Sequence, residues 1–412
     1  MGERVEASLG RRAFLVGSGA LAACDRRSRA PQPSVEASSD AEADAARPGD
    51  PDASIDRPAS TFALFDAFPA LGAALPRVEL GRFPSPVERA RSLVPGRLWI
   101  KRDDDFTRAA SWRETFEPAR TFGGGKVRKL ELYFGEARAR GARRIVTFGG
   151  VGSNQALAAA LLGRAQGFSL RLYLAPQPPS SLTAQNLAAD AASRAEMRLF
   201  DSVAAAQAEA RREARGERDT YIIPPGGTTP LGTLGFVSAG LELAADVRAG
   251  AMPSPRRVYV ALGLGGSAVG LGIGCALGGL ATEIVGVRAS NPSTVTATTL
   301  GAIHRDTVAF ARARDPAFPA LAFDGARVRI DGRFVGGGYG VPTRAGDDAV
   351  SRAHAEESWS LDPVYTGKAL AAVLDDARDD AALGPLLFWN TASSRAVSSA
   401  PVPPAFRRWA RP

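Results

Sequence analysis

Short apolar runs alternate with longer helix-type runs along the chain from residue 144 onward. The β-branched and apolar runs predict strands at 144–148, 170–174, 197–200, 257–261 and 283–287. Runs rich in alanine and leucine predict helices at 126–140, 156–166, 181–192, 204–215, 231–249 and 267–280. Strands that alternate with helices of about ten or more residues are typical of parallel βαβ units. We therefore predict an α/β protein built from mostly parallel sheets flanked by helices.

One stretch, 258–282, contains no charged residue and raises the question of a membrane span. A spanning helix needs about 20 predominantly apolar residues. Eight glycines lie within this stretch, and each weakens a helix by roughly 1 kcal/mol relative to alanine. We predict a strand, a glycine turn and a buried helix instead.

The first 24 residues have the pattern of an export signal. A polar segment ends in Arg11-Arg12, and the eleven apolar or small residues of 13–23 are too few to span a bilayer. The arginine pair resembles a twin-arginine signal, and Leu21-Ala-Ala-Cys24 resembles a bacterial lipoprotein cleavage box, in which Cys24 becomes lipidated. Asp25 resembles the signal that retains lipoproteins at the inner membrane, so we expect the periplasmic face of that membrane. The alternative is a chance arginine pair before a buried helix.

Residues 25–60 have no apolar periodicity and are rich in Pro, Ser, Ala and Asp. Such a composition does not bury enough apolar surface to offset chain entropy, so we predict a disordered tether. The domain organisation therefore begins with an export signal over 1–24 and a tether over 25–60.

Composition narrows the function classes. The 412 residues carry a formal charge of +8, and 47 of the 51 basic residues are arginine, which indicates a genome-wide codon bias more than a nucleic-acid partner. A basic stripe with interleaved aromatic residues is also missing from the sequence. Only two cysteines and two histidines occur, which argues against a disulfide framework, a structural zinc site or a Cys/His catalytic pair.

Three glycine-rich segments are candidates for ligand binding. Gly123–Lys126 places a lysine at a predicted helix start, where the helix dipole lowers an amine's pKa and so favours Schiff-base chemistry; the alternative is a surface lysine. Gly149–Gln155 places Ser153 at a helix N-cap, where backbone N–H groups bind a carboxylate; the alternative is ordinary capping. Gly263–Ser267 follows a strand and opens a helix, a geometry that cradles a single phosphate; the alternative is close helix–strand packing.

Two tyrosines occupy turns bounded by glycine or proline. Tyr339 lies in Gly338-Tyr-Gly-Val-Pro and Tyr365 in Asp362-Pro-Val-Tyr-Thr-Gly-Lys. A phenol beside a cofactor stacks on it or exchanges a proton. The alternative is a pair of aromatic residues at the edge of the core.

Together these segments resemble the 1-aminocyclopropane-1-carboxylate deaminase / D-cysteine desulfhydrase family, which are pyridoxal-phosphate enzymes of fold type II. The resemblance covers about residues 62–392, and includes a 27-residue spacing from Lys126 to Ser153 and a 26-residue spacing from Tyr339 to Tyr365. All four lysines of the chain fall within the family-like segments. The resemblance implies a large domain formed by 61–128 and 237–405, a small domain over 129–236, pyridoxal 5'-phosphate in the cleft, and a homodimer.

The resemblance also implies a role for each matching residue. Lys126 resembles the lysine that carries the cofactor, and Lys129 the family's second lysine. Ser153, with Asn154 and Gln155, resembles the segment that binds the substrate, and Asn154 also lies near the cofactor's phenolic oxygen. The phosphate loop corresponds to Gly263, Leu264, Gly265, Gly266 and Ser267. The active-site phenols correspond to Tyr339 and Tyr365, and the partner of the pyridine nitrogen to Thr391.

Departures from the family pattern leave the substrate open. Gly125 replaces an asparagine, and Asn390-Thr-Ala-Ser393 replaces a His-containing glycine motif. We expect a lyase that acts on a small amino acid by D-cysteine desulfhydrase-like α,β-elimination to pyruvate, ammonia and a thiol, because Thr366 and Thr391 differ from the deaminases. The alternatives are cyclopropane ring opening, a racemase of the same fold type, and a non-catalytic amino-acid-binding lipoprotein.

Overall fold

Two β-sheets organise the protein, a computed structural model of which describes residues 62–105, 123–393 and 397–410. The larger sheet has the strand order β1-β2-β10-β7-β8-β9. Its strands are β1 (Val87–Arg89), β2 (Leu98–Arg102), β10 (Leu386–Asn390), β7 (Arg257–Leu262), β8 (Glu283–Arg288) and β9 (Val328–Asp331). All pairs are parallel except β1 with β2. The export signal, Cys24 and the tether lie outside the described residues.

The smaller sheet has the order β5-β4-β3-β6, and all of its pairs are parallel. Its strands are β3 (Arg144–Gly150), β4 (Ser169–Ala175), β5 (Glu196–Leu199) and β6 (Thr220–Ile223). This sheet lies wholly within the segment 129–236, and the larger sheet lies wholly outside it. The division into domains at those boundaries stays a prediction.

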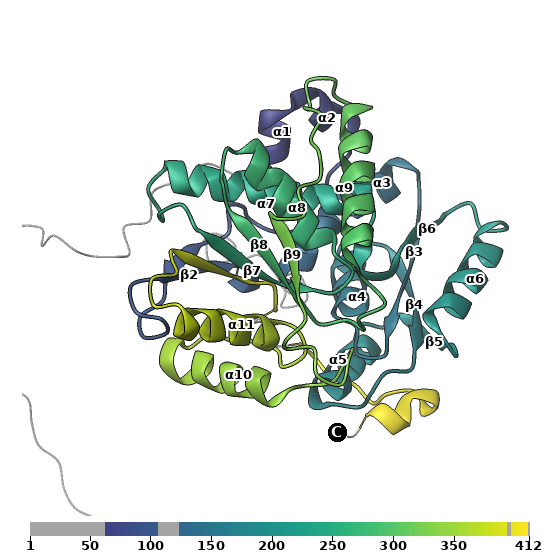
Figure 1. The fold of residues 1–412 in the computed structure, drawn as a ribbon. Coiled ribbons are helices and arrows are strands. Elements are labelled where there is room, and N and C mark those ends of the chain that lie inside the picture. Colours follow the sequence, from purple (N-terminus) through teal and green to yellow (C-terminus); the bar gives the residue numbers. More distant parts are fainter. Residues whose placement is uncertain (1–61, 106–122, 394–396, 411–412) are drawn as a thin grey trace, which may run out of the picture. The chain divides into compact units, whose positions relative to one another are not determined.

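Helices cover both faces of each sheet (Figure 1). On the small sheet, α4 (Asn154–Ala165) and α5 (Ser181–Ala192) pack on the face of Leu172 and Leu174. The opposite face, with Phe148 and Tyr173, packs on α6 (Val203–Ala214). The opposite faces follow from the period of two along a strand, which turns successive side chains to opposite sides.

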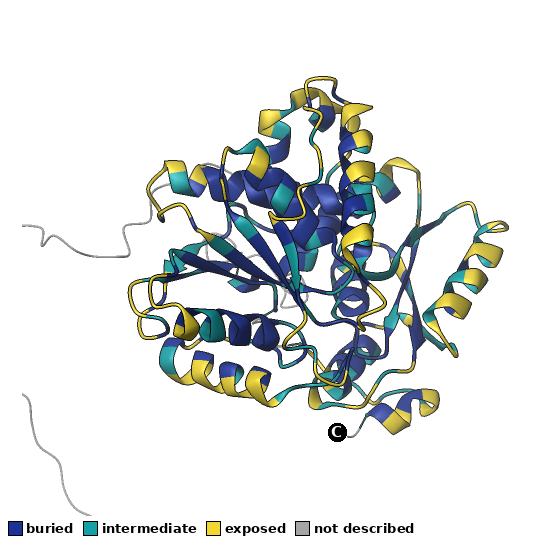
Figure 2. Ribbon diagram, in the orientation of Figure 1, coloured by how far each residue is buried: buried dark blue, intermediate teal, exposed yellow. Residues whose placement is uncertain are grey.

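The larger sheet lies between two helical layers. One layer contains α7 (Pro230–Arg248), α8 (Gly266–Leu277) and α9 (Ala297–Arg312); the other contains α10 (Arg344–Glu357) and α11 (Thr366–Asp379). Figure 2 shows α7 and α8 almost wholly buried, while α6 and α10 keep an exposed stripe. The remaining described helices of the α type are α1 (Ala63–Ala67), α2 (Pro69–Ala74) and α3 (Val127–Ala139).

The structure confirms the α/β prediction and the interpretation of the uncharged stretch. Residues 258–282 form most of β7, the glycine turn, α8 and the segment after it. Small residues let α7 and α8 approach closely, because a Cβ at Gly274 would lie 2.2 Å from the carbonyl oxygen of Val237. Within the described ranges, no helix combines the length and apolar character needed to cross a bilayer.

A buried ionic network joins the elements that carry the loops described below. Arg128, at the start of α3, contacts Asp103 at 2.7 Å and Glu242 of α7 at 2.8 Å. Lys101 of β2 contacts Glu242 at 2.6 Å, and the Trp389 indole N–H of β10 donates to Asp103 at 2.8 Å. All five side chains are at most 5 % exposed. The network therefore links α3, β2, α7 and β10 beneath the surface of a large cavity.

Candidate active site

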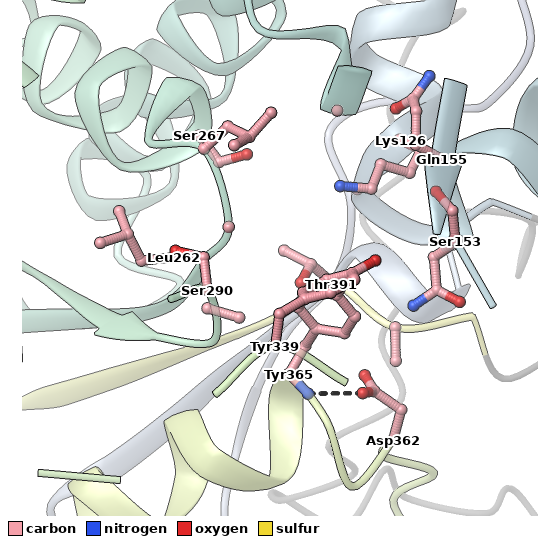
Figure 3. Close-up of a pocket in the computed structure, with 18 of the residues that line it drawn as sticks. Lys126, Ser153, Gln155, Leu262, Ser267, Ser290, Tyr339, Asp362, Tyr365 and Thr391 are labelled. Carbon is pink, nitrogen blue, oxygen red and sulfur yellow. Dashed lines mark hydrogen bonds between the residues drawn. The ribbon is translucent and has the colours of Figure 1, made fainter. Parts of the chain in front are cut away.

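A cavity of about 760 Å³ lies at the carboxyl ends of strands from both sheets. This is the place where parallel α/β sheets bind their ligands. Every predicted site residue within the described ranges lines it (Figure 3). These residues are Lys126, Ser153, Asn154, Gln155, Gly263, Leu264, Gly265, Gly266, Ser267, Tyr339, Tyr365 and Thr391. Cys24 lies outside the described residues.

Lys126 reaches the cavity from a tight glycine turn. Gly123 and Gly124 have φ values of 143° and 52°, which L-residues rarely adopt. A Cβ at Gly124 would lie 2.1 Å from the carbonyl oxygen of Ala392, so only glycine fits this approach to β10. The chain then forms η4 (Gly124–Lys126) and enters α3. The Lys126 amine points into the cavity (Figure 3).

Burial lowers the pKa of Lys126, and the carboxylate of Asp362 opposes that shift. The direction agrees with the sequence-based expectation, and desolvation is its largest cause. A lowered pKa makes a neutral amine more accessible near neutral pH, and such an amine is a nucleophile and a proton acceptor.

The glycine at position 125, where the family pattern has asparagine, has a steric explanation. A Cβ at Gly125 would lie 3.1 Å from Thr391 Cγ2 and 3.1 Å from Phe236 Cζ. Thr391 and Phe236 thus occupy the space beside the lysine, and Thr391 also accepts the Gly125 N–H through its carbonyl oxygen at 3.2 Å. Gly125 and Thr391 therefore form one packed unit.

The Ser153 segment presents polar groups at the start of α4. Ser153 is the N-cap, and its Oγ accepts the Ala156 N–H at 3.3 Å. Asn154 is held by Asn186 of α5, whose amide donates to the Asn154 side-chain oxygen at 2.7 Å. Gln155 is 3 % exposed, and both of its side-chain polar atoms are buried without a hydrogen-bond partner. Buried unpaired polar groups are costly, so this segment is suited to receive a polar ligand.

The opposite end of the cavity is suited to an anion. Gly265 has a φ of 94° and lets α8 begin directly after β7, with its first N–H groups facing the cavity. The side chains of Thr228 and Thr233 lie 3.2 Å from a Cβ placed at Gly266. Thr228 lines the cavity, and the buried Thr233 hydroxyl has no hydrogen-bond partner among the described residues. Lys129 also lines the cavity, and its amine donates to the Gly226 carbonyl oxygen at 3.2 Å.

Lys129, which the resemblance matched to the family's second lysine without a stated function, lines the same cavity as Lys126. Burial lowers its pKa well below the ordinary value, and the nearby Lys126 lowers it further. A bound anion would counter both effects, because a nearby negative charge favours the protonated amine.

The two predicted tyrosines form a pair over the cavity. Their rings are 6.3 Å apart at an angle of 70°. Burial raises the pKa of both phenols, so each keeps its proton at neutral pH. Tyr339 is held by Asn291, whose side-chain oxygen accepts its backbone N–H at 2.9 Å.

Asp362 is the main residue that the sequence reasoning missed. It is 8 % exposed and lines the cavity. Its carboxylate accepts the backbone N–H groups of Val364 at 3.0 Å and Tyr365 at 2.7 Å, and the Thr366 hydroxyl at 2.8 Å (Figure 3 shows the bond to Tyr365). An aspartate followed by proline before a helix was the available signal, since Asp commonly accepts N–H groups at such turns.

The arrangement combines an amine with a lowered pKa, two proton-bearing phenols, and a helix start and a glycine loop that line the same cavity. Among the described residues, no group of three or more His, Cys, Asp or Glu side chains is placed to hold a metal ion. These groups suit acid–base chemistry on a small ligand that carries an anionic group.

Comparison with known proteins is consistent with this geometry. Residues 78–387 match the family described as pyridoxal-phosphate dependent enzyme. The chain is 34% identical over 344 residues to nocardicin C-9' epimerase of Nocardia uniformis subsp. tsuyamanensis, covering 80% of this chain and 97% of that protein. It is 32% identical over 342 residues to D-cysteine desulfhydrase of Salmonella paratyphi A, covering 78% and 95%.

A solved structure shows the same likeness. The crystal structure of an ACC deaminase homologue superposes with a TM-score of 0.66 at 27% identity, covering 81% of this chain and 95% of that chain.

Proposed function

The chain belongs to the family of pyridoxal-phosphate-dependent enzymes, and from this premise we propose that it is a lyase of the D-cysteine desulfhydrase kind. In that reaction D-cysteine and water give pyruvate, ammonia and hydrogen sulfide. One observation carries the proposal: a half-buried lysine with a lowered pKa shares a cavity with a helix start and two protonated phenols.

The residues of the cavity fit pyridoxal phosphate. The Thr228 side chain, the Lys129 amine and the α8 N-terminus line the cavity and suit its phosphate. Lys126 is placed to bind its aldehyde carbon, and Thr391 lines the wall beside Gly125 as a candidate partner for its ring nitrogen. When bound, the cofactor withdraws electrons from the substrate's Cα.

Residues of the chain bind the substrate carboxylate, remove the Cα proton and protonate the leaving group. The N–H groups at the start of α4, with the Ser153 hydroxyl, hold the substrate carboxylate. Lys126, once its amine is free, accepts the proton from Cα. A phenol of the Tyr339–Tyr365 pair donates a proton to the departing thiolate, since both phenols are protonated at neutral pH.

Asp362 orients the phenol of Tyr365, which is one of the two candidates for protonating the departing thiolate. Its bonds to the backbone of Val364 and Tyr365 fix the turn from which the Tyr365 ring projects. Thr366, used with Thr391 to distinguish desulfhydrases from deaminases, is fully buried and donates its hydroxyl to Asp362. The preference for a thiol substrate over the cyclopropane therefore rests on Thr391.

Epimerisation at Cα is the second candidate. Its support is the 34% identity to nocardicin C-9' epimerase, slightly above that to the desulfhydrase. The same lysine and phenols serve both reactions, because each begins with removal of the Cα proton. A reaction that returns this proton releases no ammonia.

The two candidates separate in one experiment with purified protein loaded with pyridoxal phosphate. D-Cysteine and L-cysteine are each supplied in D₂O, and ammonia release and Cα deuteration are followed together. 1-Aminocyclopropane-1-carboxylate, whose Cα carries no hydrogen, is followed by ammonia release alone. We expect pyruvate and ammonia from D-cysteine. Deuterated substrate without ammonia would support the epimerase, and neither product from any amino acid would favour a binding protein without turnover.

A further inference from the structure

The cavity extends farther than the groups used in the reaction. Besides the Ser153 segment, Leu182 and Gln185 of α5 line it, together with Phe148 and Val203. Phe148 and Val203 belong to the cluster under α6, on the face of the small sheet opposite to α4 and α5. The cavity therefore passes over the carboxyl edge of the small sheet. We call this part, lined by Phe148, Leu182, Gln185 and Val203, the outer arm.

The outer arm lies beyond the reach of a cysteine side chain. α6 begins after β5, which is two strands away from β3 in the sheet. At the usual spacing between neighbouring strands this separation is about 10 Å. Cysteine has two side-chain atoms beyond Cα, so a cysteine whose carboxylate is held at Ser153 leaves Val203 untouched.

The side chains that line the outer arm are apolar or polar without a charge. Among the described lining residues of the whole cavity, only Lys126, Lys129 and Asp362 are ionisable with a charge at neutral pH, apart from phenols that stay neutral. All three belong to the reaction end of the cavity. The arm itself offers the half-buried apolar side chains of Leu182 and Val203 and the exposed amide of Gln185.

We infer that the outer arm binds an extended, uncharged substituent on the substrate's β-sulfur. The preferred substrate is then an S-substituted cysteine and not cysteine itself. The inference rests on the proposed function, which supplies the elimination. In this reaction the bond between Cβ and sulfur breaks, the sulfur leaves with the electron pair and takes a proton as a thiol, and water hydrolyses the remaining enamine to pyruvate and ammonia.

The test compares S-benzyl-D-cysteine with D-cysteine on the holoenzyme. Equilibrium binding is followed by the change in the visible absorbance of the bound cofactor, and pyruvate release gives kcat/KM. We expect the benzyl substrate to bind more tightly than D-cysteine in the wild type. Val203→Trp, which fills the arm, should reduce the ratio of the two affinities about tenfold or more, the range of a lost hydrophobic pocket contact.

Ala205→Trp is the matched control, because Ala205 lies on the exposed side of α6; it should keep the wild-type ratio. If Val203→Trp does not fold, Leu182→Trp tests the same arm from α5. An unchanged affinity ratio in a folded arm variant overturns the inference, whether or not pyruvate forms. Binding without pyruvate overturns the elimination alone, and the ratio still decides the arm. Absence of binding by both amino acids overturns both proposals.

Discussion

At the scale of single residues, the packing of Gly125 against Thr391 is the clearest local departure from the family pattern. The two positions share one space, since a Cβ at Gly125 would come within 3.2 Å of both Thr391 Cβ and Cγ2. A larger residue at 125 therefore pushes Thr391 away from the cavity. In the sequence, Gly125 and Thr391 are two separate differences from the family pattern. In the structure they are coupled, because the side chain of Thr391 fills the space beside Gly125.

We predict that Gly125→Asn weakens binding of pyridoxal phosphate at least about tenfold, because overpacking costs about 1–3 kcal/mol and 1.4 kcal/mol is a factor of ten. A titration followed by cofactor absorbance measures the dissociation constant. The double variant Gly125→Asn/Thr391→Ala, which opens space beside residue 125, should recover part of the affinity. Wild-type binding by the single variant would show that the two positions do not share space.

The origin of the lysine's lowered pKa was beyond the reach of the sequence at this scale. The glycines and Lys126 indicated the position of a ligand-binding turn correctly. The pKa of Lys126 is lowered by burial and raised in part by the carboxylate of Asp362. Both the burial and the approach of Asp362, which is far along the chain, arise only through folding. Gln155 and Thr233 likewise become candidates for ligand contacts only once the structure shows that their buried polar atoms have no hydrogen-bond partner among the described residues.

At the scale of elements, local periodicity predicted the small sheet well. The helix expected at 181–192 is α5, and the strand expected at 144–148 is β3, extended by two residues. The four-residue strands β6 and β9 were missed, because so short a run carries little periodicity. The position of β10 between β2 and β7 depends on pairing between distant segments, which no local pattern encodes.

The Arg128 network stabilises the junction of four elements. We predict that Arg128→Met lowers the free energy of unfolding by about 3–5 kcal/mol, because Asp103 and Glu242 lose a buried counter-charge. Urea denaturation followed by circular dichroism measures the change. Arg212→Met, which removes an exposed pair with Glu209, is the control and should leave the midpoint unchanged. Equal effects of the two variants would contradict a special role for the buried network.

Asp190 of α5 introduces a pH dependence. Its carboxylate is fully buried and has no hydrogen-bond partner among the described residues, and burial raises its pKa well above the ordinary value. The folded state therefore holds a proton that the unfolded state releases, so this group's contribution to stability falls as pH rises from the unfolded pKa toward the folded one.

We predict that Asp190→Asn raises the free energy of unfolding at pH 8 by about 1–3 kcal/mol, the cost of an unsatisfied buried group, and has less effect at pH 4. Denaturation at both pH values measures the difference. Asp201→Asn, at an exposed position, should change neither value. A variant that is less stable at pH 8 than the wild type would mean that the carboxylate is satisfied in the folded protein.

At the scale of the whole molecule, the N-terminal pattern predicts where the enzyme acts. We propose that the mature chain begins at a lipidated Cys24, because an arginine pair, a short apolar run and a Leu-Ala-Ala-Cys box follow in order. Mass spectrometry of the membrane fraction should find a diacylglyceryl modification on Cys24, and Cys24→Ala should block processing. An unprocessed chain in the cytosol of the native host would contradict the proposal.

The central claim is that Lys126 is the residue that carries pyridoxal phosphate, and covalent trapping tests it most directly. The loaded protein is reduced with borohydride and digested, and the modified lysine is located by mass spectrometry. Only four lysines compete, which makes the assignment unambiguous. The account predicts the pyridoxyl group on Lys126 and its loss in Lys126→Ala, with the circular dichroism of the fold retained. A pyridoxyl group on Lys129, Lys101 or Lys368 would contradict it.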